Sequence, residues 1–256
     1  MQDSSPAYRV VGAARGWDWV VEGFDLFKRN PGIWIALILI WGLVVMVSGA
    51  IGIGQLLVPL FTPVLLGGLM IGCALLKRGE ELEIAHLFAG FQKGPFVPLL
   101  LVGVALLVAQ IAVSVLVFAI LSVAGVGSLL GGLMAGQVNE AAGWATGMGG
   151  MALGVMLAML LALVLYSIVW LALAFAPALV ALGGEQPVPA LQASLKAALA
   201  NWPALLVYSL ITIALLVVAL IPAGLGLLVL GPVMIAANYA SYRDIFPELA
   251  EQLPQD

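Results

Sequence analysis

The chain has 256 residues, of which 64% are hydrophobic and 9% are charged, with a formal net charge of −4. Soluble globular domains have about 25% charged residues, so this composition excludes a soluble domain and predicts an integral membrane protein. Because nucleic-acid binding requires a basic face, the acidic balance argues against nucleic acid as a partner. The single cysteine, Cys73, excludes an internal disulfide.

Six long apolar stretches predict six transmembrane helices, since a helix needs about 20 apolar residues to cross a bilayer. The expected spans are 31–47, 57–76, 95–123, 150–178, 203–221 and 225–242. The third connection, residues 125–149, is long and rich in glycine. We expect it to form either a flexible loop or a segment that dips into the membrane interface with Trp144 as its anchor.

The basic residues alternate with the spans and predict the topology. No Lys or Arg lies in the connections near Gly49, Gly136 or Ala223. All nine lie in the other segments: Arg9, Arg15, Lys28, Arg29, Lys77, Arg78, Lys93, Lys196 and Arg243. Because Lys and Arg near span ends stay on the cytoplasmic side, we expect both termini and both basic loops to be cytoplasmic.

A threefold pattern accompanies the spans, because Pro31, Pro95 and Pro203 each open an odd-numbered span. Proline suits the first turn of a helix, where its missing N–H has no intrahelical partner. A short segment with apolar residues at helical spacing precedes each proline. Such a segment forms an amphipathic helix, which lies either in the membrane interface or against neighbouring helices.

The predicted fold is therefore an all-α integral membrane protein with a single membrane domain over residues 1–256. Its six transmembrane helices form three parallel helix-hairpin pseudo-repeats, each preceded by a short interfacial amphipathic helix. The pseudo-repeats cover about 16–78, 80–184 and 188–243. A parallel repeat differs from the inverted repeats of many secondary transporters.

One segment carries a family resemblance: Trp17, Phe24, Leu26, Phe27, Lys28, Arg29, Asn30 and Pro31. With the five apolar stretches that follow, it resembles the YciC-like family of six-span bacterial inner-membrane proteins, as does the later stretch 82–91. The layout is also similar to the membrane domain that accompanies some glycerophosphodiester phosphodiesterases. The resemblance implies a bacterial inner-membrane location. It transfers no catalytic residue, because the single His86 cannot supply the chemistry of the phosphodiesterase.

No motif in the sequence indicates catalysis. The six spans contain no Asp, Glu, Lys, Arg or His, which disfavours a proton-coupled carrier, and the chain contains neither an H-E-x-x-H motif nor a P-loop. His86 and Glu83 are too few to form a metal site, so we interpret His86 as a surface residue. We therefore expect a non-enzymatic protein without a cofactor or a resident metal.

Two groups of residues are the candidate functional positions. Lipid contacts are expected at Trp17, Phe24, Phe27, Lys28, Arg29, Phe88, Phe91 and Lys93. Candidates to line a polar cavity are Gln110, Tyr166, Asn238 and Tyr239, although such groups commonly form hydrogen bonds between helices instead.

These features support two functional hypotheses. The first is a membrane protein that organises lipid or a partner protein at the inner membrane, with membrane lipids and a protein partner or a second copy of the chain as its partners. The alternative is a carrier or pore for a lipid-like or small neutral solute. An interfacial lipid enzyme is a third class, but the sequence offers no recognisable nucleophile or metal set for it.

Overall fold

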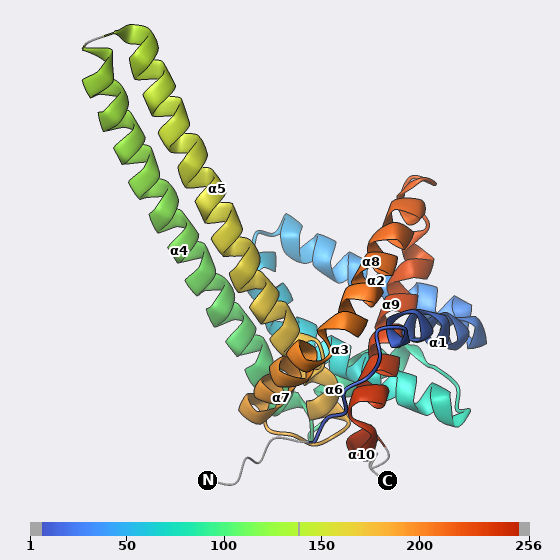
Figure 1. Cartoon of the computed structure of the whole chain (residues 1–256). Coiled ribbons are helices and arrows are strands. Elements are labelled where there is room, and N and C mark those ends of the chain that lie inside the picture. Colours follow the sequence, from blue (N-terminus) through green and yellow to red (C-terminus); the bar gives the residue numbers. More distant parts are fainter. Residues whose placement is uncertain (1–6, 138, 251–256) are drawn as a thin grey trace. The chain divides into compact units, whose positions relative to one another are not determined.

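The computed structural model describes residues 7–137 and 139–250 (Figure 1). These residues are almost entirely helical, and they form no strand. In chain order the elements are α1 (Arg15–Arg29), α2 (Pro31–Ala50), α3 (Gly54–Arg78), the 3₁₀ helix η1 (Ile84–Phe91), α4 (Phe96–Gly136), α5 (Glu140–Leu173), α6 (Ala176–Ala181), α7 (Pro187–Ala200), α8 (Trp202–Leu220), α9 (Leu227–Ile245) and α10 (Pro247–Ala250).

Five helical stretches in the described part of the chain are long and apolar enough to cross a membrane. They are Pro31–Ala50, Leu56–Arg78, Phe96–Gly136, Gly143–Ala181 and Trp202–Leu220. Length and composition therefore support an all-helical membrane protein. The sixth predicted span corresponds to α9, which is not among the five because its last turns carry polar and charged residues, Arg243 and Asp244 among them.

The predicted helix breaks at the three prolines are confirmed. α2 begins at Pro31, α4 begins one residue after Pro95, and α8 begins one residue before Pro203. Pro31 and Pro203 lie in the first turn of the helix that they open, where proline has no hydrogen bond to lose. Each amphipathic segment is helical, although the second one, η1, is a 3₁₀ helix.

The predicted loop at residues 125–149 is wrong, because most of this stretch is helical. α4 continues to Gly136 and α5 begins at Glu140. A glycine inside a helix lowers helix stability by about 1 kcal/mol relative to alanine. Here the glycines allow two helices to pack closely. A Cβ atom on Gly143 would lie 2.7 Å from the carbonyl oxygen of Gly132. Close packing of the two backbones therefore offsets the poor helix propensity.

The contacts divide the chain into two compact units, a division that the sequence analysis did not anticipate. Among the described residues, the first unit comprises 7–106 and 171–250, and the second lies within Leu107–Trp170. The second unit is an antiparallel pair formed by parts of α4 and α5, which lie side by side (Figure 1). Small residues line the inside of this pair, and its outer surface is apolar.

The core of the first unit lies where α1 crosses α8 and α9. Gly16 and Gly23 permit this close crossing, since a Cβ atom on Gly23 would lie 2.5 Å from the carbonyl oxygen of Val233. Trp19 of α1 is fully buried and packs edge-to-face on Tyr208 of α8, with ring centroids 6.3 Å apart. α1 is therefore a packed element of the core and also has one exposed face.

Candidate lipid-contact sites

The exposed face of α1 is the first candidate site. Trp17, Val21 and Phe24 are 57%, 42% and 44% exposed, and their spacing of i, i+4 and i+7 places them on one side of the helix. Lys28 continues this row, and its ammonium nitrogen lies 5.1 Å from the centroid of the Phe24 ring. We call these four residues the α1 stripe. It combines aromatic rings with a cation, as membrane-interface anchors do.

The other predicted lipid contacts on α1 have structural roles. Phe27 is 7% exposed and belongs to the core, so its side chain is not available to lipid. It follows Gly23 by one helical turn, and therefore it faces inward with that glycine. Arg29 donates a hydrogen bond of 2.9 Å to the carbonyl oxygen of Leu76 and ties the end of α1 to α3.

The predicted contacts around η1 are exposed. Phe88 and Phe91 are 49% and 40% exposed, and Lys93 is also exposed. The Phe91 ring stacks on Phe61 of α3 and on Phe96 of α4, with centroid separations of 6.0 and 5.6 Å. η1 lies along α3 rather than apart from it, so its aromatic residues form part of a packed surface.

A charged cluster that the sequence analysis missed holds α1 against the end of α9. The carboxylate of Asp244 is largely buried and accepts hydrogen bonds from Arg9, from Arg15 at 2.6 Å and from the Trp19 indole at 3.1 Å. Burial raises the pKa of Asp244, but the hydrogen bonds from Arg15 and Trp19 and the positive charge of Arg15 outweigh it, so the pKa lies below its ordinary value. Asp244 therefore stays ionised at neutral pH.

The segment before α1 is fixed by the same region. The backbone N–H of Arg9 donates to the carbonyl oxygen of Ile245 at 2.7 Å. The buried side chain of Asn201, between α7 and α8, accepts from the N–H of Val11 at 2.8 Å and donates to the carbonyl oxygen of Arg9 at 3.1 Å. The N-terminal segment, α9 and the α7–α8 junction are thus joined by directional bonds.

The acidic residues of α1 are all paired within the chain. Glu22 lies 2.7 Å from Arg243 and 3.4 Å from Arg15, while Asp18 lies 3.1 Å from Arg15. Asp25 lies 2.7 Å from Lys28. The negative charges on this side of α1 are therefore balanced by basic residues of the same chain. This favours the interpretation of the acidic residues as a solvated helix face.

His86 has a local structural role. Its Nδ1 atom accepts the backbone N–H of Glu83 at 2.9 Å, and the Glu83 side chain in turn caps the start of η1. Within residues 7–137 and 139–250, no group of three or more His, Cys, Asp or Glu side chains is placed to hold a metal ion. Cys73 is buried.

The four predicted cavity residues are divided between the two units. Asn238 donates a hydrogen bond of 3.0 Å to the carbonyl oxygen of Ala174, and Tyr239 is only 3% exposed in the core. Gln110 and Tyr166 belong to the second unit, where both are partly exposed. None of the four lines the apolar pocket described next.

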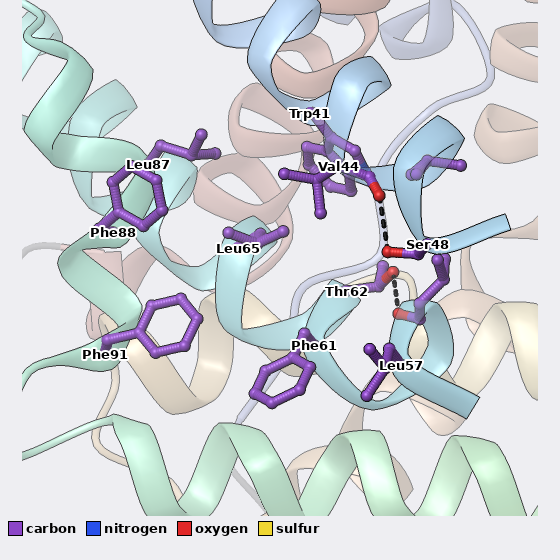
Figure 2. Close-up of a pocket in the computed structure, with 12 residues that line it drawn as sticks. Trp41, Val44, Ser48, Leu57, Phe61, Thr62, Leu65, Leu87, Phe88 and Phe91 are labelled. Atoms are coloured by element: carbon purple, nitrogen blue, oxygen red, sulfur yellow. Dashed lines mark hydrogen bonds between the residues drawn. The ribbon is translucent and has the colours of Figure 1, made fainter. Parts of the chain in front are cut away.

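The second candidate site is an apolar pocket of about 240 Å³ between α2, α3 and η1 (Figure 2). The residues that line it are Trp41, Val44, Val45, Ser48, Leu57, Val58, Phe61, Thr62, Leu65, Leu87, Phe88 and Phe91. Phe88 and Phe91 therefore line the pocket as well as the surface. Sequence periodicity gives no signal for this pocket, because its walls come from three separate elements.

The length and apolar composition of the five helical stretches indicate a helical membrane protein. Within that class, the chain belongs to the family of a domain of unknown function, DUF7847, which matches residues 23–253. Comparison with curated proteins and with solved structures finds no match.

Proposed function

We propose that the protein is a non-enzymatic component of the bacterial inner membrane that organises lipid. In this proposal residues 225–242 form the sixth span, the hairpins form three parallel repeats, and both termini are cytoplasmic. The distribution of the nine basic residues supports this topology. The resemblance to the YciC-like proteins and to the phosphodiesterase membrane domain supports the cellular location.

The α1 stripe carries the proposal. Trp17 and Phe24 have the amphipathic or apolar rings that favour the headgroup level of a bilayer. Lys28, whose side chain is exposed beside its partner Asp25, supplies a positive charge that attracts anionic headgroups. The opposite face of α1 is held by the core and by the Asp244 cluster. The stripe is thus presented on a rigid element, whereas a free amphipathic helix would first have to become ordered.

The test uses nanodiscs that contain equal amounts of anionic and zwitterionic phospholipid. It measures the ratio of the two lipids that remain bound to the protein after its release. Lys28→Glu should lower the anionic enrichment at least fivefold, since one basic residue near an anionic surface contributes about 1 kcal/mol and the new carboxylate also repels anionic headgroups. Lys28→Arg keeps the charge and is the matched control. If the Lys28→Glu, Trp17→Ala double variant retains the lipid profile of the parent protein, lipid organisation through α1 is wrong.

The alternative function, a carrier or pore, is favoured by one observation. The pocket between α2, α3 and η1 is lined almost wholly by hydrocarbon, which suits a lipid-like solute better than a polar one. The test is translocation of a fluorescent phospholipid across proteoliposomes. A rate equal to that of protein-free vesicles counts against transport and leaves lipid organisation in place.

A further inference from the structure

We propose that the pocket between α2, α3 and η1 is a binding site for one acyl chain of a membrane lipid. This inference rests on the proposed membrane role, because it takes the bilayer as the source of the ligand. It concerns a site separate from the α1 stripe and adds a specific, stoichiometric ligand to the general contact with lipid.

The walls of the pocket are already in place (Figure 2). Leu87 of η1 is 1% exposed, and the Phe91 ring is held between Phe61 and Phe96. Glycine brings η1 onto α3, since a Cβ atom on Gly68 would lie 2.6 Å from the carbonyl oxygen of His86. A preformed pocket costs little ordering of the protein when a ligand binds.

The chemistry of the lining selects hydrocarbon. The two hydroxyl groups in the pocket, those of Ser48 and Thr62, donate to carbonyl oxygens of their own helices, Val44 and Val58, each at 2.6 Å. Figure 2 shows both bonds running along the helices. Among the described side chains that line the pocket, none is charged. A polar ligand group would lose its hydrogen bonds on entry, whereas an acyl chain loses none.

The size and surroundings of the pocket identify the acyl chain as the occupant. A helix from a partner protein is about 10–12 Å across with its side chains, which is too wide for a partly open pocket of about 240 Å³ between three elements. α2 and α3 are both apolar enough to cross a membrane, and Leu39, Leu43 and Met46 on α2 are exposed. Hydrocarbon chains of the bilayer therefore surround the walls at high local concentration.

The experiment uses the full-length protein in nanodiscs that contain a phospholipid with a photoreactive diazirine in one acyl chain. After illumination, mass spectrometry measures the labelled fraction and locates the crosslinked peptides. The parent protein should carry one label at a fixed ratio, and the label should map to α2, α3 and η1. Labels scattered evenly over the exposed surfaces of α2, α5 and α8 would indicate annular lipid only and overturn the proposal.

The chain offers a matched pair of variants on α2. Val44 lines the pocket and Val47 does not, and their side chains are similarly exposed at 46% and 48%. Val44→Trp should lower the labelled fraction about tenfold, because excluding about two methylene groups from apolar contact is enough for that factor. Val47→Trp should leave it unchanged. Equal labelling of the two variants would overturn the proposal.

A second variant guards against misfolding of Val44→Trp. Phe88→Ala removes one wall of the pocket from a half-exposed position without adding bulk, so it should weaken labelling while the helical content stays constant. Lys28→Glu separates the two proposals: it should change headgroup enrichment and leave the acyl label intact. If headgroup enrichment does not depend on Lys28, lipid organisation through α1 is wrong. If the acyl label does not depend on Val44 or Phe88, the acyl-chain site is wrong.

Discussion

Asp244 accepts hydrogen bonds from three side chains near or in α1, those of Arg9, Arg15 and Trp19. Hydrogen bonds that involve a charged group contribute more to folding stability than hydrogen bonds between neutral groups. Trp19 is fully buried, so its indole N–H has no access to solvent if the carboxylate is removed. Asp244 therefore links α1 and the segment before it to the end of α9 through one side chain.

Asp244→Asn should lower the free energy of unfolding at pH 7 by about 2 kcal/mol, the scale of a hydrogen bond to a charged group. Because the folded pKa of Asp244 lies below the ordinary value of 3.8, its stabilising effect is complete above about pH 3.8 and is lost as the pH falls further. Thermal unfolding of the purified protein measures both effects. The variant should lack this acid-dependent loss, and identical pH profiles for the two proteins would contradict the assignment.

At the scale of elements, glycines determine which helices meet. Gly23→Ala adds a methyl group at 2.5 Å from the carbonyl oxygen of Val233. Overpacking should lower the free energy of unfolding by about 1–3 kcal/mol. The higher helix propensity of alanine, about 1 kcal/mol, offsets part of this loss. Gly32→Ala on α2 is the control, since a Cβ atom there meets nothing within 4 Å. If Gly32→Ala lowers the unfolding temperature more than Gly23→Ala does, the close crossing of α1 and α9 is wrong.

The same reasoning applies within the second unit. Gly143→Val places a branched side chain against the backbone of Gly132 and should separate α4 from α5, while Gly149→Val, where the Cβ site is open, should not. Hydrogen exchange at residues 128–150 should quicken only in the Gly143 variant, because loss of packing favours local opening. Equal protection in both variants would argue against close packing of these helices.

The helices also show which features could be predicted from local sequence patterns and which could not. Helix breaks at Pro31, Pro95 and Pro203 were predictable because proline acts on its own backbone. The helical form of residues 125–136 and 140–149 was not, because it depends on a glycine-to-glycine contact between two helices. Phe27 was misplaced for a related reason: aromatic residues lie on both faces of α1, and only α8, α9 and their neighbours decide which face is covered.

At the scale of the whole molecule, the N–H of Arg9 bonds to the carbonyl oxygen of Ile245, which places the segment before α1 and the end of α9 on the same side of any membrane. In vesicles of Cys73→Ala protein, Val10→Cys and Glu248→Cys should react with an impermeant maleimide from the cytoplasmic face. Asn139→Cys should react from the opposite face, as the positive-inside pattern predicts. Labelling of Val10→Cys and Glu248→Cys from opposite faces would contradict the structure, and labelling of both from the outer face would invert the proposed topology.

The sequence by itself determined that this is an all-helical, strongly apolar chain, with its basic residues grouped between spans and its helices broken at prolines. Composition, hydropathy and proline geometry are properties of single residues or short segments, so they can be read directly from the chain. Only the tertiary structure decided that Asp244 pairs with Arg9 and Arg15, that Phe27 is buried, and that Trp41, Phe61 and Phe88 surround one pocket. Each of these depends on residues distant in sequence, whose proximity follows from helix packing and not from any local pattern.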